Sequence, residues 1–201
     1  MTLENENNQK IYESLCVLKT NISKTRINRI HAANRLLSTE KFLQGINIYY
    51  SCFSAVLAIL GLYVKDTFFS VWSVIFTVVL AISIVHLNAQ KYGNRSQELK
   101  TNYIALHELL FKVEFAVGRC DIRKYDEFAE AYCKLLQTSE NHITMDYLKA
   151  KYKNGDLVKM DFAYYWAIKV TNFVVKTILI LLPIVVMSIF FYKGIFVGVL
   201  W

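Results

Sequence analysis

Small and hydrogen-bonding residues recur at helical spacing inside two long uncharged segments of this sequence. In the first segment they are Asn47, Ser51, Ser54, Ala58 and Gly61, which are three or four positions apart. In the second they are Ser70, Ser73, Thr77 and Ala81, with the same spacing. Each set therefore lies on one face of a helix. Such a face either lets two apolar helices approach closely or, repeated around an oligomer, lines a weakly polar pore.

His86 is the only histidine in these two segments. It lies one turn before the end of the second segment, and Asn88 and Gln90 follow it. A histidine at that depth is a candidate for a protonation-sensitive gate, or for a hydrogen bond at the membrane surface.

Motifs of catalysis and cofactor binding do not occur in the sequence. It has no Gly-rich phosphate loop, no dinucleotide fingerprint, no H-E-x-x-H and no nucleophile elbow. The four cysteines form no C-x-x-C pair, and the four histidines are dispersed. The sequence therefore predicts a protein that is not an enzyme and that uses no cofactor or metal.

Composition indicates the elements that position these residues. Of the 201 residues, 55% are hydrophobic and 19% are charged, with 7 Gly and 1 Pro. Soluble domains are roughly 45–50% apolar and about 25% charged, and turn-rich folds need more Gly and Pro. Residues 42–64 and 67–90 carry no charge, and each run is long enough to cross a hydrocarbon core of about 30 Å. Only Lys65 and Asp66 separate the runs, which predicts an antiparallel transmembrane hairpin.

A third apolar segment lies near the end of the sequence. Sixteen uncharged residues separate Lys176 from Lys193, and apolar residues precede Lys176. If the Lys176 side chain extends to the head groups, residues 170–192 are long enough to span the bilayer, with a kink at Pro183. The alternative is a segment that packs along the membrane surface.

The distribution of basic residues predicts the topology. Residues 1–41 and 91–169 together hold 20 of the 23 Lys and Arg, whereas Lys65 is the only one at the hairpin tip. The positive-inside rule then places both flanks, and the N-terminus, in the cytoplasm. The net charge of +7 is thus read as a topology signal, and no direct nucleic-acid binding is expected.

Both flanks of the hairpin show helical periodicity. Apolar residues before the hairpin, beginning with Ile11, Leu15, Leu18 and Ile22, form an amphipathic helix that runs toward the membrane. After the hairpin, apolar residues keep heptad phase: Tyr92, Leu99, Tyr103, Leu106, Leu110, Val113 and Val117. This stripe is either the seam of an oligomer or the face that packs on residues 11–37 of the same chain, and Ile104, Leu109, Phe111 and Phe115 widen it enough to contact a second chain as well.

The sequence as a whole predicts an all-α membrane protein with four regions. Residues 1–41 form a cytoplasmic amphipathic helix, and residues 42–90 form the two-span hairpin. Residues 91–169 form a cytoplasmic helical region, which completes a helical bundle. Residues 170–201 form the third membrane segment.

The chain resembles the SLATT proteins of bacteria over roughly residues 10 to 170. The resemblance rests on a basic helix with Arg26, Arg29 and the run His31-Ala32-Ala33-Asn34-Arg35-Leu36, on the tight hairpin, and on a helix that opens with Lys91-Tyr92-Gly93-Asn94-Arg95. Residues 170–201 depart from a plain two-span pattern.

The resemblance implies a function in anti-phage defence. It implies an inner-membrane effector, multi-pass and without enzymatic residues, that oligomerises and permeabilises the membrane. The trigger would come from a neighbouring nucleotidyltransferase, nucleotide sensor or reverse transcriptase. A non-conducting anchor or sensor that holds a cytoplasmic partner at the bilayer is the alternative.

Overall fold

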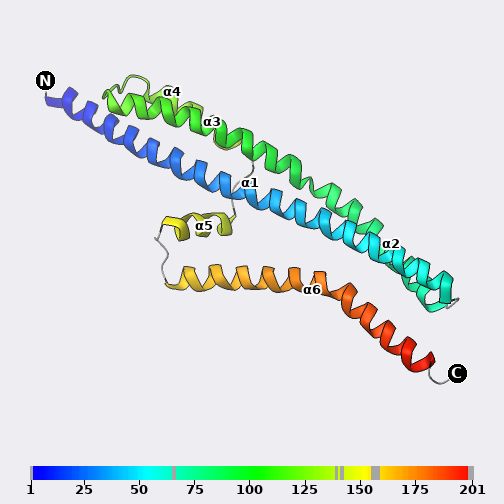
Figure 1. Ribbon diagram of the computed structural model, residues 1–201. Coiled ribbons are helices and arrows are strands. Elements are labelled where there is room, and N and C mark those ends of the chain that lie inside the picture. The colour runs from blue at the N-terminus through cyan, green and yellow to red at the C-terminus, as the bar shows by residue number, and fades with distance from the viewer. Residues whose placement is uncertain (1, 65–66, 139, 141–142, 155–158, 199–201) are drawn as a thin grey trace. The chain divides into compact units, whose positions relative to one another are not determined.

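The computed structural model describes residues 2–64, 67–138, 140, 143–154 and 159–198. Its helices, in chain order, are α1 (Thr2–Val64), α2 (Thr67–Gln90), α3 (Tyr92–Gly118), α4 (Tyr125–Gln137), α5 (Thr144–Asn154) and α6 (Lys159–Gly198) (Figure 1). No strand occurs among the described residues, which confirms the all-α fold class. The predicted turn at Lys65 and Asp66 lies outside the described residues.

The predicted amphipathic helix and the first predicted span form one continuous helix, α1. Its 63 residues contain no proline. The α2 helix ends at Gln90 because Lys91 adopts a left-handed backbone conformation, with φ 48°, and α3 begins at the next residue. A single residue therefore separates the second predicted span from the helix that follows it.

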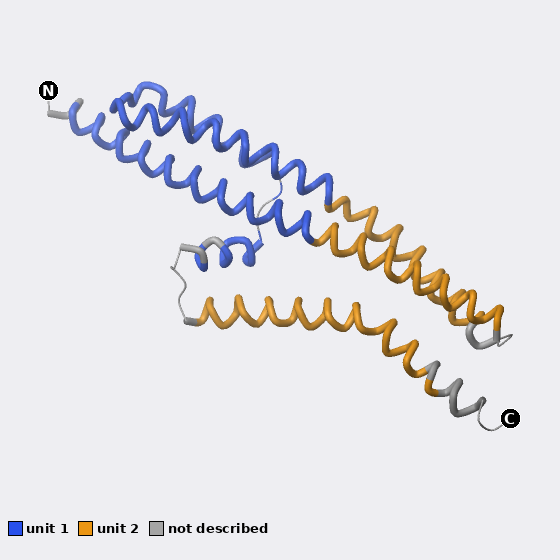
Figure 2. The backbone as a smooth tube through the Cα atoms, viewed as in Figure 1, with its two compact units in different colours: residues 1–38, 93–158 blue, residues 39–92, 159–201 orange. Residues whose placement is uncertain are grey.

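The chain forms two compact units, which Figure 2 colours separately. The first unit comprises residues 1–38 and 93–158, and so holds the first part of α1 with α3, α4 and α5. The second unit comprises residues 39–92 and 159–201, and holds the second part of α1 with α2 and α6.

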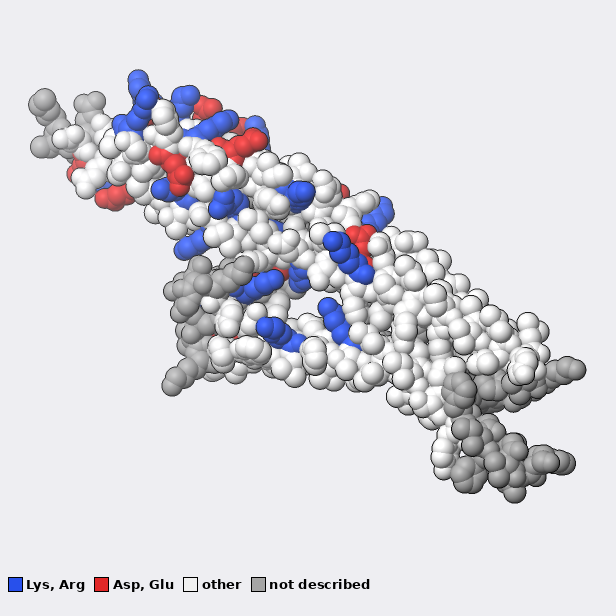
Figure 3. All heavy atoms as spheres, viewed as in Figure 1, with Lys and Arg blue, Asp and Glu red and all other residues white. Residues whose placement is uncertain are grey.

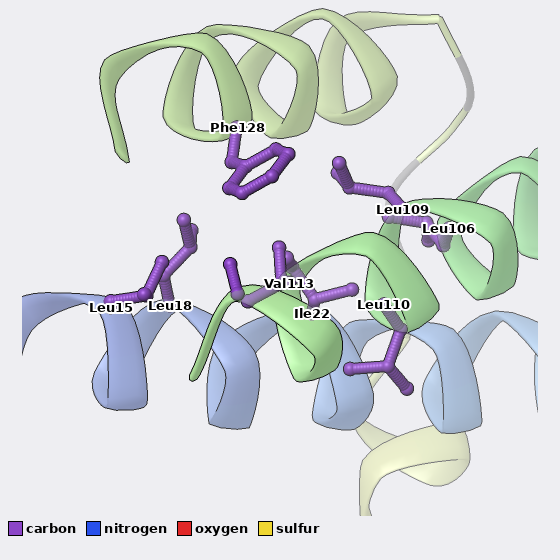
Figure 4. Close-up of a cluster of buried hydrophobic side chains, with 9 residues drawn as sticks. Leu15, Leu18, Ile22, Leu106, Leu109, Leu110, Val113 and Phe128 are labelled. Atoms are coloured by element: carbon purple, nitrogen blue, oxygen red, sulfur yellow. The ribbon is translucent and has the colours of Figure 1, made fainter. Parts of the chain in front are cut away.

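The core of the first unit forms where α1, α3 and α4 meet (Figure 4). Leu15, Leu18 and Ile22 supply the α1 face at spacings of three and four residues, and Phe128 enters from α4. The α3 helix contributes the remaining side chains of this core: Leu106, Leu109, Leu110, Val113 and Ala116. The apolar residues that recur at helical spacing therefore pack against one another within a single chain.

The second unit exposes large apolar side chains along its helices. Leu62 is 79% exposed, Val85 is 71% and Phe173 is 70%. In Figure 3 the charged side chains lie over the first unit and the start of α6, whereas the hairpin surface carries none. A surface of this kind is stable in lipid and unstable in water.

Among the residues that the structure describes, three helical stretches are long and apolar enough to cross a membrane. They are Asn5–Tyr63, Ser70–Gly118 and Met160–Ile189, and they contain the two predicted spans and the third segment. The α6 helix contains Pro183 and is visibly bent (Figure 1). The chain is thus an all-α membrane protein with a hairpin and a third candidate span.

Candidate functional site

Three hydroxyl side chains join the two helices of the hairpin. The Ser54 Oγ donates to the Ser73 carbonyl, and the Ser73 Oγ donates to the Ser54 carbonyl, each at 3.2 Å. The Ser54 Oγ also lies 2.8 Å from the Thr77 Oγ1. Because Ser54 and Ser73 are buried, the two bonds between them are shielded from the surroundings, whereas Thr77 is exposed. The network is a polar contact between otherwise apolar helices.

Large apolar side chains pack around this network. Phe53 and Leu57 are buried beside Ser54 on α1. The Phe53 and Phe76 rings meet edge to face, with centroids 5.4 Å apart. Ser54, Ser73 and their neighbours therefore form a packed helix interface in this conformation.

The predicted stripe on α2 only partly coincides with its packed face. The buried or half-buried residues of α2 recur at spacings of three and four: Ser73, Phe76, Leu80, Ser83, Leu87 and Gln90. Of the predicted stripe, Ser73 belongs to this set, whereas Ser70, Thr77 and Ala81 are exposed on one flank of the helix.

The stripe on α1 divides in a similar way. Gly61 is buried, Asn47 and Ala58 are half-buried, and Ser51 is exposed. The Ser51 hydroxyl donates to the Asn47 carbonyl of its own helix at 2.8 Å, so it needs no partner across an interface. A pore-lining role for either stripe stays a prediction.

His86 lies on the exposed surface of α2. Its neighbour Asn88 accepts a backbone hydrogen bond from Lys91 at 3.3 Å, where α2 ends. His86 therefore lies one turn before the end of α2, and a gating role stays a prediction.

The heptad residues of α3 mostly face the core of their own chain. Leu99, Leu106, Leu110 and Val113 are buried, and the last three pack against α1 and α4. Tyr92, Tyr103 and Val117 are half-buried. At the buried positions the stripe packs within its own chain, which is one of the two alternatives that the sequence left open. These side chains cannot contact a second chain while the bundle is closed.

A different face of α3 is unoccupied in the single chain. Ile104 is 45% exposed, Phe111 is 60% and Phe115 is 61%, at spacings of seven and four residues. The His107 ring stacks near Phe111 at 4.4 Å, and the Arg119 guanidinium lies 4.1 Å from the Phe115 ring. We call Ile104, Phe111 and Phe115 the α3 outer stripe.

Arg29 has a structural role that sequence patterns did not reveal. It is 3% exposed, and its guanidinium donates to the carbonyls of Leu135 at 2.8 Å and Leu136 at 3.3 Å, as well as to the Asn102 side chain. The Asn102 amide also donates to the Leu135 carbonyl, at 2.8 Å. Burial lowers the pKa of the Arg29 guanidinium from its ordinary value. Arg29 thereby ties the C-terminal end of α4 to α1 and α3.

A second arginine ties α5 to α1. Arg35 forms two hydrogen bonds with the Asp146 carboxylate, at 3.0 and 3.1 Å, and Asp146 is 1% exposed. The same carboxylate accepts the Ile143 backbone N–H at 3.2 Å, just before α5 begins. Two of the arginines interpreted from the sequence as topology signals, Arg29 and Arg35, therefore also hold the helices of the first unit together.

Metal chemistry has no support in the part of the chain that the structure describes. No group of three or more His, Cys, Asp or Glu side chains there lies close enough to hold a metal ion. The four cysteines are free thiols.

The model of one protein family matches residues 11–189, which is most of the chain. Its description is SMODS and SLOG-associating 2TM effector domain family 5, or SLATT_5. The chain belongs to this family. The SLATT resemblance predicted from the sequence is thereby confirmed, and the matched range includes most of α6. No curated protein and no solved structure matches the chain.

SLATT membership identifies the chain as a membrane effector domain linked to anti-phage conflict systems and associated with SMODS and SLOG modules. The family description names two transmembrane segments, which agrees with the hairpin of α1 and α2. The described residues include three helices that are able to cross a membrane.

Proposed function

We propose that this chain is the killing component of a bacterial abortive-infection system, which oligomerises and permeabilises the inner membrane when a nucleotide- or nucleic-acid-sensing partner triggers it. The N-terminus and residues 1–41 and 91–169 lie in the cytoplasm, in line with the positive-inside rule. The Ser54, Ser73 and Thr77 network carries the proposal, because such hydroxyls hydrogen-bond equally well to a neighbouring helix or to water. The same hydroxyls can therefore support a second arrangement of the hairpins, in which they face water instead of the neighbouring helix.

The exposed flank of α2 supplies the surface that would line the path. Ser70, Thr77 and Ala81 are small, and they lie outside the packed face of α2. In an oligomer this flank meets another copy or water, and the Thr77 hydroxyl then lowers the cost of wetting.

Thr77→Val is the variant that tests conduction with the least change of packing. It removes one hydroxyl at nearly unchanged side-chain size, and with it the Thr77 Oγ1 contacts to the Ser54 Oγ and the Ser73 carbonyl, whereas Ser54→Leu would overpack the buried interface and disturb any path as well. We expect Thr77→Val to reduce triggered dye release from liposomes by about threefold to tenfold, at unchanged insertion, because about 1 kcal/mol of polar stabilisation is lost in the wetted state.

Ser83→Ala is the matched control for Thr77→Val. Ser83 lies on the same helix, and its hydroxyl donates only to the Val79 carbonyl, at 2.8 Å. We expect wild-type dye release from this variant. Equal release from Thr77→Val and wild type would contradict a path along this flank, and no release from wild type under any trigger would contradict permeabilisation itself.

The α3 outer stripe favours a second candidate function, a non-conducting anchor that recruits a cytoplasmic partner. Three exposed apolar side chains on a helix outside the predicted spans are a typical docking surface. Under this function, changes in the stripe abolish partner capture while membrane potential stays constant during activation. Loss of membrane potential on activation would exclude it.

A further inference from the structure

Two adjacent tyrosines of the first span donate hydrogen bonds to the backbone of α6. The Tyr50 hydroxyl donates to the Leu179 carbonyl at 2.8 Å, and the Tyr49 hydroxyl donates to the Ile180 carbonyl at 3.2 Å. Their rings meet edge to face, with centroids 5.8 Å apart. Tyr50 lies eight residues after Phe42, or about 12 Å along the helix from the start of the uncharged run. Both bonds therefore form at a depth where water is scarce.

Pro183 explains why the Leu179 carbonyl is available. Proline has no backbone N–H, so the carbonyl four residues earlier, that of Leu179, loses its partner in the helix. Pro183 is almost fully buried in the second unit, where lipid and apolar side chains provide no replacement donor. The Tyr50 hydroxyl takes the place of the missing N–H.

The contact satisfies both partners at once. A phenol hydroxyl in an apolar environment is costly unless it is hydrogen-bonded, and so is an unpaired carbonyl. Lys176 adds a contact nearer the cytoplasmic end, with its Nζ 4.7 Å from the Phe42 ring centroid. Phe42 contacts Lys176, and the tyrosines contact Leu179 and Ile180, so α6 and the first span run in the same direction.

We propose that Tyr49 and Tyr50, bound to the carbonyls near Pro183, form a lock that holds α6 against the first span in the resting state, and that activation releases it. The gating part rests on the proposed permeabilisation. While the interface is dry, the Tyr50 hydroxyl satisfies the Leu179 carbonyl in place of the missing N–H. Once water enters, it can solvate the carbonyl and the phenols equally well, and the lock loses its advantage. The lock is therefore stable in a sealed membrane and unstable in a wetted one.

The lock is tested first by distance, in a way that does not depend on leakage. Spin labels at Leu62→Cys and Ile189→Cys, in full chain with the four native cysteines replaced by serine and inserted in lipid nanodiscs, report the position of α6 relative to α1. We expect one narrow distance in the wild-type background. In Tyr49→Phe/Tyr50→Phe we expect the population at that distance to fall at least twofold. Tyr164→Phe, which changes an exposed tyrosine of α6, serves as the control and should match the wild type.

Pro183→Ala distinguishes hydrogen bonding from packing. Alanine restores the backbone donor, so the Leu179 carbonyl no longer needs Tyr50. We expect Tyr50→Phe to broaden the distance distribution in the Pro183 background and to add nothing in the Pro183→Ala background. An equal effect in both backgrounds, or no effect of the double phenylalanine variant, would overturn the lock.

Dye release from liposomes then tests gating. We expect Tyr49→Phe/Tyr50→Phe to raise untriggered release about tenfold over wild type. A broadened distance distribution with wild-type basal release, in a protein that still responds to its trigger, would overturn the gating role alone. Absence of release from every variant and from triggered wild type would overturn the proposed function and the gating role with it, while the distance result would still decide the lock.

Discussion

Arg29→Met should loosen α4 from the helical bundle of the first unit by about 3 kcal/mol, because hydrogen bonds to a charged group contribute about 1.5–3 kcal/mol each and part of that gain is offset by the cost of burying the charge. The variant leaves the Leu136 carbonyl without this donor, and the Leu135 carbonyl keeps its bonds from the Asn102 amide and the Thr138 hydroxyl. Hydrogen exchange of the α4 amides, in the full chain in nanodiscs, measures this loss of stability. We expect about a hundredfold faster exchange in the variant than in the wild type.

The electrostatic setting makes Arg29 sensitive to substitution. Among the described residues, no carboxylate forms an ion pair with Arg29. The guanidinium is instead stabilised by the last carbonyls of α4, where the helix dipole is negative. Lysine keeps the charge but lacks the planar fork that reaches several acceptors, so Arg29→Lys should recover only part of the protection.

Arg123→Met is the matched control for Arg29→Met. The Arg123 side chain is 87% exposed and pairs with Asp121 in the connection before α4. We expect wild-type exchange in α4 from this variant, because exposed ion pairs contribute little. Wild-type exchange in Arg29→Met as well would show that the buried cation does not hold α4 in place.

The membrane part of the fold could be predicted because lipid allows few solutions. A charge-free run of 23 residues followed after two residues by another of 24 must form a helical hairpin in a bilayer. The third segment was ambiguous for a physical reason, since Lys176 interrupts its apolar run. In the structure the Lys176 ammonium lies 4.7 Å from the centroid of the Phe42 ring, a contact that the sequence alone could not show.

The roles of the arginines could not be predicted from periodicity. A periodic pattern shows which face of a helix is buried and leaves the partner open. Arg29 binds Asn102 and Leu135, which are 73 and 106 residues away in sequence. Its neighbours Leu15, Leu18 and Ile22 were correctly placed on a buried face, whereas Arg29 itself was read as a topology charge.

The small-residue stripe of α2 also shows that spacing identifies a face of a helix but not what that face contacts. Spacing placed Ser70, Ser73, Thr77 and Ala81 on one face of α2, and they do share one. However, the packed face of α2 is rotated toward Phe76 and Leu80, with only Ser73 common to both. Small residues were taken as the contact because they allow close approach, but the larger side chains bury more apolar area and determine the packed face.

Phe111→Glu should abolish oligomer formation and killing while leaving the bundle folded. The α3 outer stripe is the apolar face left open once Leu106, Leu110 and Val113 are used in the core of the chain. Burying a phenylalanine contributes about 1.5–3 kcal/mol, and a carboxylate at the centre of an apolar contact is costly in its own right. We expect at least a hundredfold weaker self-association, measured by mass photometry of the full chain in detergent or nanodiscs, and survival of cells that express the variant together with its trigger.

Val17→Glu provides the matched control for this prediction. Val17 is an apolar residue of α1 in the same unit, and its exposed fraction of 58% is almost equal to the 60% of Phe111. The two variants add the same charge at nearly the same exposure, so a difference between them reflects the position and the apolar side chain that is lost there. Loss of association in both would mean that added negative charge acts without regard to the stripe. Normal association in Phe111→Glu would exclude the α3 outer stripe as the oligomer contact. A monomeric wild type that loses partner capture on Phe111→Glu would favour the second candidate function, the non-conducting anchor. Loss in Phe111→Glu alone would establish that the face opposite the bundle core joins one copy to the next.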